Sequence, residues 1–341
     1  MEALYAGLDV SDKKTNICIV NRDGALHWQG VCASDPDALS RVLKKRAPGL
    51  AVAVLETGPI SSFLYHGLQV RGIDTVCICA RHAKGVLSTR LNKSDENDAE
   101  GLAQLARTGW YKAVHIKDQS THLDRTLLRV RHQLVKSHTD MLNQLRGLLK
   151  LFGLKLGVVT TPGKRAERLA HLFEREPALN PLLDPLVSAL SGIEFELKKL
   201  NKRVKQQATG DVVCKRLMSV PGVGPITALT FKSSIEDPAR FKRACDVGAY
   251  AGLTPRRFQS GDMDTMGHIS KRGDKMLRRA LYEAANSILG RLKRDCALKA
   301  WGQKLAEHKG SKRARVAVAR KLAILMHRIW VTGEEFDWQK A

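Results

Sequence analysis

The first residues of the chain fall into short apolar runs of the length expected for β-strands. Residues 4–9 (LYAGLD) are apolar and end on a carboxylate, and residues 16–21 (NICIVN) are apolar and β-branched. The turn-forming residues 22–24 (RDG) then precede a third run, residues 25–32. Runs of this kind bounded by turn residues are typical of strands. The pattern predicts a three-stranded meander at the start of the chain.

After the meander, helical and strand patterns alternate. Residues 36–46 and 59–71 predict helices, whereas residues 51–55 (AVAVL) form a continuous apolar run typical of a buried parallel strand. A further strand is expected at residues 73–79. Three antiparallel strands followed by alternating helix and strand is the element order of an RNase H-like domain, so the expected fold class is α/β for this part.

Two carboxylates end strands that are neighbours in that arrangement. Asp9 ends the first strand and Glu56 ends the strand at residues 51–55, so we expect them to face one another at the edge where open α/β sheets assemble their sites. A third acidic element follows. Ser94 is a candidate N-cap, and Asp95 and Asp98 are three residues apart on one face of a helix expected to run to about residue 107.

Four carboxylates in one place repel each other unless a cation lies between them. Carboxylate oxygens suit Mg²⁺ or Mn²⁺, and two such ions about 3.5–4 Å apart can clamp the attacking and leaving oxygens of a phosphodiester. The pattern therefore indicates phosphoryl transfer. The alternative for Asp95 and Asp98 is that they only complement the dipole of their helix.

The middle of the chain has long-helix periodicity. Apolar residues at alternating steps of three and four cover residues 120–152 and again residues 183–204, on either side of a connection at residues 157–163. This pattern predicts a coiled-coil hairpin that pairs protomers or supports nucleic acid. An ordinary helical subdomain is the alternative.

The last third of the chain begins with a helix-hairpin-helix signal. Residues 217–225 (LMSVPGVGP) join two expected helices, and Gly222 and Gly224 would let backbone N–H groups at a helix N-terminus bind a phosphate. A structural turn that binds nothing is the alternative. The rest of this region is expected to be mainly helical.

A glycine-rich segment at residues 249–274 is expected to be loop-rich. It places four cations around Ser260 and Ser270, namely Arg256, Arg257, Lys271 and Arg272. Cations beside a hydroxyl favour a bound phosphate. From composition alone these serines are phosphate contacts or turn residues, because a serine nucleophile also needs in-line positioning and neighbours that handle its proton and the developing charge.

Composition narrows the partners. The 341 residues hold 57 Lys+Arg against 34 Asp+Glu, a net charge of +23 that favours a polyanion, with nucleic acid first and an anionic membrane surface second. With no apolar run of about 18 residues and no signal-peptide pattern, we expect a cytoplasmic protein without a membrane partner. Seven scattered cysteines indicate a reducing compartment rather than a disulfide framework.

The order of these motifs resembles the DEDD transposases of bacterial insertion sequences, the bridge-RNA-guided serine recombinases. The resemblance covers nearly the whole chain and rests on residues 7–11 (GLDVS), 55–58 (LETG), 93–99 (KSDENDA), 221–224 (PGVG), 252–261 (GLTPRRFQSG) and 269–273 (ISKRG). It implies a RuvC-like domain at residues 1–115, a coiled coil at 116–210 and a C-terminal transposase domain at 211–341.

The same resemblance implies the roles of single residues and partners. The metal-binding carboxylates would be Asp9, Glu56, Asp95 and Asp98, and the nucleophile would be Ser260. A structured guide RNA would pair with donor and target DNA, and dimers would assemble into tetramers that combine the carboxylates of one protomer with the serine of another. A RuvC-like nuclease that uses metal-bound water, and a nucleic-acid-packaging protein without catalysis, remain as alternatives from the residues alone.

Overall fold

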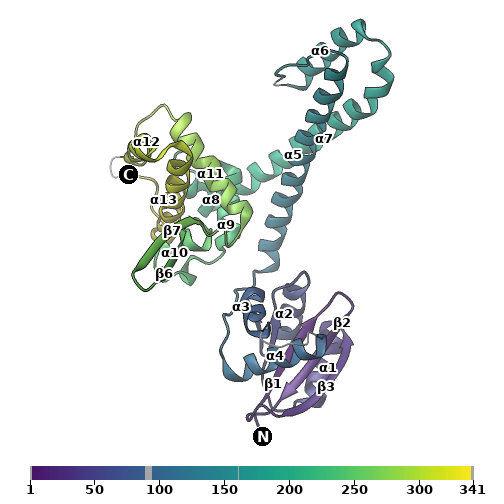
Figure 1. The fold of residues 1–341 in the computed structure, drawn as a ribbon, viewed down its shortest axis with the longest axis vertical. Coiled ribbons are helices and arrows are strands. Elements are labelled where there is room, and N and C mark those ends of the chain that lie inside the picture. Colours follow the sequence, from purple (N-terminus) through teal and green to yellow (C-terminus); the bar gives the residue numbers. More distant parts are fainter. Residues whose placement is uncertain (1, 89–93, 160, 339–341) are drawn as a thin grey trace. The chain divides into compact units, whose positions relative to one another are not determined.

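The computed structural model describes residues 2–88, 94–159 and 161–338. The chain divides into two compact units, Met1–Asp118 and Gln119–Ala341, each of which is described by itself (Figure 1). The first boundary lies close to the one expected at residue 115. The second expected boundary, at residue 210, falls inside the second unit and stays a prediction.

The first unit is built on a mixed five-stranded sheet. Its strands are β1 (Leu4–Val10), β2 (Lys14–Val20), β3 (Leu26–Ala33), β4 (Leu50–Glu56) and β5 (Thr75–Ile78). The order across the sheet is β3-β2-β1-β4-β5. The first three strands are antiparallel, β4 runs parallel to β1, and β5 runs parallel to β4. The predicted meander and the predicted neighbourhood of β1 and β4 are therefore confirmed.

Helices cover both faces of this sheet. Leu39 and Leu43 of α1 (Pro36–Arg46) and Leu64 and Leu68 of α2 (Ser61–Val70) form one core with alternate strand residues. On the other face lie α3 (Ala80–Leu87), which the sequence pattern does not predict, and α4 (Asp95–Thr108). Because strand side chains alternate between faces, one side of β1 packs on α1 and α2 and the other on α4.

The second unit begins with a helical hairpin. The helices α5 (Gln119–Leu151) and α7 (Leu179–Gly210) pack against each other, and the contacts Arg131–Asn201 and His138–Glu194 show that they run antiparallel. The predicted connection at residues 157–163 is incomplete, because a further helix, α6 (Pro162–Arg175), lies between the two. Supercoiling of the pair stays a prediction.

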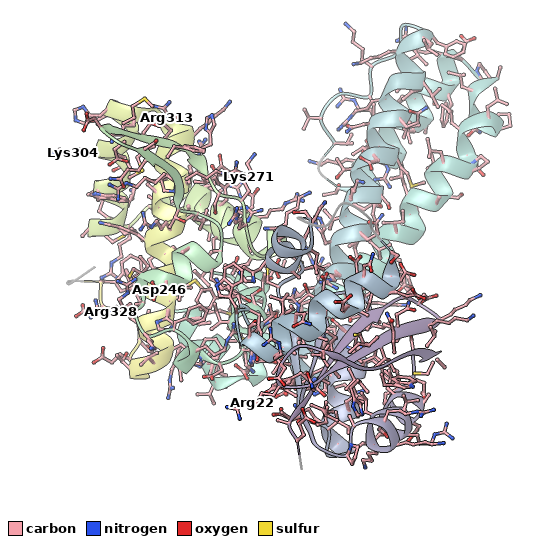
Figure 2. The ribbon with its side chains drawn as sticks, turned by 60° about the horizontal axis from the view of Figure 1, so that its bottom comes forward. Arg22, Asp246, Lys271, Lys304, Arg313 and Arg328 are labelled. Atoms are coloured by element: carbon pink, nitrogen blue, oxygen red, sulfur yellow. The ribbon has the colours of Figure 1, made fainter. Side chains whose placement is uncertain are left out.

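The rest of the second unit is mainly helical, as expected. It comprises α8 (Val212–Leu217), α9 (Pro225–Ile235), a 3₁₀ turn (Pro238–Arg240), α10 (Cys245–Tyr250), α11 (Lys275–Gly290), α12 (Ala297–Lys309) and α13 (Ser311–Thr332). Their core also takes Leu127 from α5 and Val204 from α7, so the base of the helical hairpin is part of this body. Figure 2 labels Lys271, Lys304 and Arg313 on its surface.

One expectation for the second unit was wrong. Residues 249–274 are not a loop but contain a β-hairpin of β6 (Pro255–Ser260) and β7 (Met263–Ile269). The physical reason is the two-residue turn Gly261-Asp262, in which Gly261 has φ +53°. Glycine takes this conformation without the steric cost of a side chain, and a Gly-Asp pair between two short runs is a hairpin signal.

Within the residues that the structure describes, no helix is both long and apolar enough to cross a membrane. All seven cysteines are free thiols.

Candidate active site

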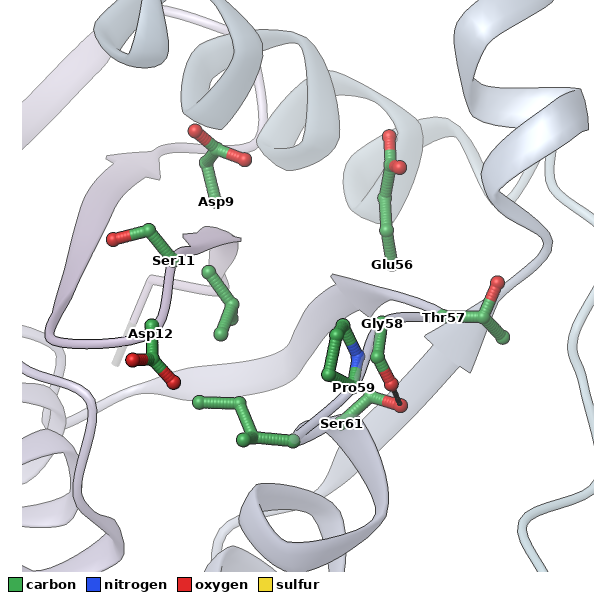
Figure 3. Close-up of a pocket in the computed structure, with 10 residues that line it drawn as sticks. Asp9, Ser11, Asp12, Glu56, Thr57, Gly58, Pro59 and Ser61 are labelled. Carbon is green, nitrogen blue, oxygen red and sulfur yellow. Dashed lines mark hydrogen bonds between the residues drawn. The ribbon is translucent and has the colours of Figure 1, made fainter. Parts of the chain in front are cut away.

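Asp9 and Glu56 lie next to each other at one edge of the first unit's sheet. The parallel pairing of β1 and β4 runs to Leu8 and Leu55, and the two carboxylates come one residue later on each strand. Both are half-buried. They line one cavity of about 240 Å³ together with Ser11, Asp12, Thr57 and Ser61. Figure 3 shows both carboxylates turned to the same side of the sheet, with that of Asp12 turned away from them.

The helix α4 is fixed against the same face of β1. A Cβ on Gly7 would lie 2.1 Å from Ala99 O and 2.3 Å from Ala103 N, so the strand backbone touches the helix backbone there. Tyr5 packs further along the helix, in a cluster with Leu102 and Ala106. Tyr5, Gly7 and Asp9 lie on the same face of β1, because every second residue of a strand does. Since Tyr5 lies near the middle of α4 and Gly7 nearer its start, Asp9 lies toward the N-terminus of the helix.

The start of α4 carries the remaining predicted carboxylates. Ser94 is the N-cap, as expected, and its hydroxyl accepts a hydrogen bond from Asn97 N at 3.2 Å. Asp95 and Asp98 follow in the first turn; Asp95 is exposed and Asp98 half-buried. The sequence therefore positions these two at the helix end toward which Asp9 lies, while Lys93 of the same motif lies outside the described residues.

The four carboxylates do not form a finished metal cage in this structure. Among the described residues, no group of three or more His, Cys, Asp or Glu side chains is close enough to hold an ion. Asp95 and Asp98 are not part of the cavity lining, and Asp9, Glu56 and Asp98 each interact with other groups of the chain. The donors at the cavity are carboxylate and hydroxyl oxygens, the type that Mg²⁺ and Mn²⁺ prefer. The donor chemistry fits such an ion, and the four-ligand site stays a prediction.

Ser260 lies at the tip of the β6–β7 hairpin in the second unit. It pairs with Met263 directly before the turn and is exposed, as is every residue of β6. Ser270 lies instead at the base of the hairpin, where its hydroxyl accepts a hydrogen bond from Arg272 N at 3.4 Å and its own N–H donates to Thr254 O at 2.8 Å. Ser270 is therefore held as a turn residue, whereas the Ser260 hydroxyl is presented at a tip.

The base of the hairpin is joined tightly to the helical body. A Cβ on Gly252 would lie 2.0 Å from Arg272 O, and one on Gly273 would lie 1.9 Å from Tyr250 O. The next residue, Asp274, caps α11 and pairs with Arg125 of α5 at 2.7 Å. Burial would raise the pKa of Asp274, but the charge and hydrogen bond of Arg125 hold it below its usual range. These contacts hold the start of the hairpin in place.

The four predicted cations differ in their surroundings. Arg256, Lys271 and Arg272 are exposed, and Arg256 donates only a long 3.5 Å hydrogen bond to Ser270 O. Arg257 instead donates two hydrogen bonds to Asp264, at 2.8 and 2.6 Å, and this pairing raises the pKa of the guanidinium. The charge of Arg257 is thus largely balanced within the hairpin.

The predicted Pro-Gly-x-Gly turn does join two helices, α8 and α9. Gly222 has φ +76°, and a Cβ there would lie 2.7 Å from Ala284 O of α11, which gives this glycine a packing reason. Gly224 is exposed, is the N-cap residue of α9 and has nothing within 4 Å of a Cβ position. Of the two, Gly224 is the one open to a phosphate, and its binding role stays a prediction.

Comparison with known proteins places these sites in a family. A family profile described as a DEDD transposase matches residues 6–153, and one described as the transposase IS116/IS110/IS902 family matches residues 214–301. The transposase for insertion sequence element IS1111A of Coxiella burnetii is 31% identical over 97% of this chain and 90% of its own length. A probable family 20 transposase of Pseudomonas aeruginosa is 32% identical over 69% of this chain and 71% of its own.

The chain belongs to the IS110/IS116 family of insertion-sequence transposases. The resemblance to insertion-sequence transposases inferred from the motifs is thereby confirmed. The first matched segment contains α4 and the five-stranded sheet except for the first two residues of β1, and its DEDD assignment implies an RNase H-like fold. The second contains the α8–α9 turn and the hairpin with Ser260. As a transposase, the protein acts on DNA.

The sequence analysis does not predict the β6–β7 hairpin, although it does predict a functional role for Ser260 at the tip of this hairpin. The signal was present in the Gly261-Asp262 pair between two short runs. The apolar residues Phe258, Met263 and Met266 were also missed, because nothing in the pattern suggested that they would be exposed.

Proposed function

We propose that this transposase cuts and rejoins DNA through a covalent bond between Ser260 and a DNA phosphate. The observation that carries the proposal is the exposed Ser260 hydroxyl at a hairpin tip, on the same strand as the exposed Arg256, in a chain of the transposase family. The Ser260 hydroxyl loses its proton as its oxygen attacks phosphorus, the bond to one deoxyribose oxygen breaks, and that oxygen gains a proton, so that no net proton is consumed. The phosphodiester is exchanged, not hydrolysed.

Asp9, Glu56, Asp95 and Asp98 are the residues proposed to hold Mg²⁺ or Mn²⁺. The cavity shared by Asp9 and Glu56, and the position of Asp95 and Asp98 in the first turn of α4, support this assignment. When bound, such ions neutralise charge on the scissile phosphate. The carboxylates would position the cations, and Arg256, on the same strand as Ser260, would contact a phosphate oxygen of the bound DNA.

Rejoining reverses the first step. A deoxyribose hydroxyl of the exchanged strand attacks the phosphoserine, the bond to Ser260 breaks, and the serine oxygen recovers a proton. A structured guide RNA would supply sequence specificity by pairing with donor and target DNA. Protomers would pair as dimers and assemble into tetramers in which one protomer's serine works with another's carboxylates.

Substitution of Ser260 tests the proposal. Ser260→Ala should lower recombination in cells by about 10³-fold or more, as loss of a nucleophile does in other enzymes, whereas Ser270→Ala should keep measurable recombination. On denaturing gels, the wild-type reaction should give a DNA band that runs slowly until protease is added. Parental recombination by Ser260→Ala would contradict the proposal.

A second candidate is a RuvC-like nuclease in which water attacks the phosphate. The cavity with Asp9 and Glu56 favours it, because this site lies in the sheet unit alone. In that case Asp9→Ala abolishes cleavage, Ser260→Ala does not, and no protease-sensitive band forms. In a protein that only packages nucleic acid, neither substitution alters any activity.

A further inference from the structure

The two faces of the β6–β7 hairpin differ in chemistry. Residues directly opposite each other in antiparallel strands share a face. The pairs Ser260–Met263 and Phe258–Thr265 therefore lie on one face, and the pairs Gln259–Asp264 and Arg257–Met266 lie on the other. The first of these is called the serine face below.

Arg256 and Gly267 complete the serine face. A Cβ on Gly267 would lie 3.1 Å from Cε2 of Phe258 and 3.8 Å from Cβ of Arg256, so the three residues are neighbours on one side of the hairpin. The Phe258 ring lies beside a position without a side chain, which leaves space for it on the hairpin surface. The serine face thus combines the predicted nucleophile, an aromatic ring, a methionine and an arginine.

The apolar side chains of this face are not covered by the protein. Phe258 is 58% exposed and Met263 is 70% exposed. A two-stranded hairpin is at best marginally stable on its own in water, and Phe258 and Met263 expose their side chains near the tip of this one. The arrangement fits a hairpin that functions against a partner.

The charges identify the chemistry of that partner. On the opposite face, Asp264 balances Arg257 through two hydrogen bonds. On the serine face, the hydrogen bond that Arg256 makes within the described part of the chain is the long contact with a backbone carbonyl, so the face is cationic as well as apolar. Duplex DNA has a binding partner for each of these groups: its phosphates can bind the arginine, and its base faces can stack on the aromatic ring. Its major groove admits a two-stranded ribbon, and apolar side chains inserted between base steps partly unstack them.

We propose that the serine face docks on duplex DNA with Phe258 inserted at a base step within about two nucleotides of the phosphate that Ser260 attacks. The distance follows from the strand. Two residues along β6 span about 7 Å, and DNA advances about 3.4 Å per nucleotide on each strand. The inference rests on the proposed role of Ser260 and adds a positioning residue that opens the DNA beside the cut.

The test uses full-length protein with a fluorescent duplex. The duplex spans one end of the element and carries 2-aminopurine at single positions on either side of the cleavage site, and the element's own transcripts are present. In the fluorescence measurement every protein carries Ser260→Ala, so that the DNA stays intact, whereas cleavage rates are measured with proteins that keep Ser260. We expect fluorescence to rise within two nucleotides of the site, because the base there loses stacking.

Matched variants separate Phe258 from the hairpin as a whole. Adding Phe258→Ala to the Ser260→Ala protein should remove the fluorescence rise. In the protein that keeps Ser260, Phe258→Ala should lower the cleavage rate by about tenfold or more, in line with the cost of losing an aromatic–base stack. Phe258→Trp should retain both. Met266→Ala removes an apolar side chain that is also 70% exposed but lies on the opposite face, and it should leave both unchanged.

Any of three results would overturn the inference. The first is a Phe258→Ala protein that matches the parent in both readouts, and the second is a Met266→Ala protein with the same losses. The third is a lower oligomer mass of Phe258→Ala in light scattering without DNA, which would assign the face to a second copy. A failure of the Ser260 assignment looks different, because the Ser260→Ala protein would then still cut the duplex.

Discussion

At the scale of single residues, Gly7 sets how closely α4 approaches the sheet. Its backbone lies against Ala99 O and Ala103 N, with no space for a Cβ. Asp9, two residues further on the same face, and the first turn of α4 are therefore positioned by one backbone contact. The carboxylate arrangement depends on a residue that carries no chemistry of its own.

We expect Gly7→Ala to push α4 from the sheet. Overpacking of this kind costs about 1–3 kcal/mol of folding stability. The rate of DNA cleavage should fall by more than this loss of stability explains, because Asp95 and Asp98 move with the helix. Urea unfolding and cleavage of element-end DNA measure the two effects. Gly85→Ala in α3 is the control, since nothing lies within 4 Å of its Cβ position. Equal behaviour of the two variants would contradict this role of Gly7.

At the scale of elements, a buried apolar face made most of the helices and strands predictable from the sequence. The helix expected at residues 36–46 is α1 (Pro36–Arg46), and the Ser94 cap begins α4 as expected. The β6–β7 hairpin was not predicted because neither face is buried, so no apolar alternation marks it. The helix α6 is not predicted, because Pro162 lies in the connection expected at residues 157–163, although proline is favoured at the first position of a helix.

The helical hairpin is held at its far end by a buried charge network. Arg165 of α6, only 4% exposed, contacts Glu194 of α7 through both carboxylate oxygens, and His138 of α5 contacts the same carboxylate at 2.8 Å. The hydrogen bond from Arg165 lowers the pKa of Glu194. One carboxylate thus joins three helices.

Glu194→Ala should destabilise this end of the molecule by about 3–5 kcal/mol, because removing one partner leaves the arginine charge buried without compensation. Amide hydrogen exchange in α6 and α7 measures the loss locally. Glu196→Ala is a control two residues away: its pair with Lys199 is about half exposed, and such pairs contribute less than about 1 kcal/mol. A loss as small as that of the control would show that the network does not stabilise the hairpin.

At the scale of the whole molecule, the charge of +23 is unevenly distributed. Residues 291–328, all of them described, hold twelve Lys or Arg against Asp295 and Glu307, and one ion pair, Lys299–Asp295, lies among them. Lys321 lies over the Trp301 ring at 3.7 Å, an arrangement that orients the cation without neutralising it. This surface of α12 and α13 is suited to binding phosphates of any sequence.

Replacing Lys304 and Arg313 together by glutamine should weaken DNA binding equally for all sequences. The slope of log affinity against log salt should fall by about one for each phosphate that the variant no longer neutralises. Titrations at several salt concentrations measure the slope. Lys44→Gln with Lys45→Gln in α1 removes the same charge elsewhere and should leave the slope unchanged. An equal change in both would assign the effect to net charge alone.

The site could be predicted only in part, because strand pairing positions some of its residues and helix packing or hairpin pairing positions the others. Asp9 and Glu56 meet as expected, since strand order and register place them together. The approach of Asp95 and Asp98 depends on how α4 packs, and the local sequence does not determine that. The exposure of Phe258 beside Ser260 follows from hairpin pairing, which the apolar pattern did not reveal.

The central claim is that Ser260 bonds to DNA, and mass spectrometry of the trapped protein–DNA product tests it most directly. After nuclease digestion, trypsin should release residues 258–271 (FQSGDMDTMGHISK), a peptide that contains Ser260, Thr265 and Ser270. We predict a nucleotide remnant on this peptide, with fragment ions that assign it to Ser260. A remnant on Thr265, Ser270 or another peptide, or cleaved DNA without any protein-linked product, would contradict the account.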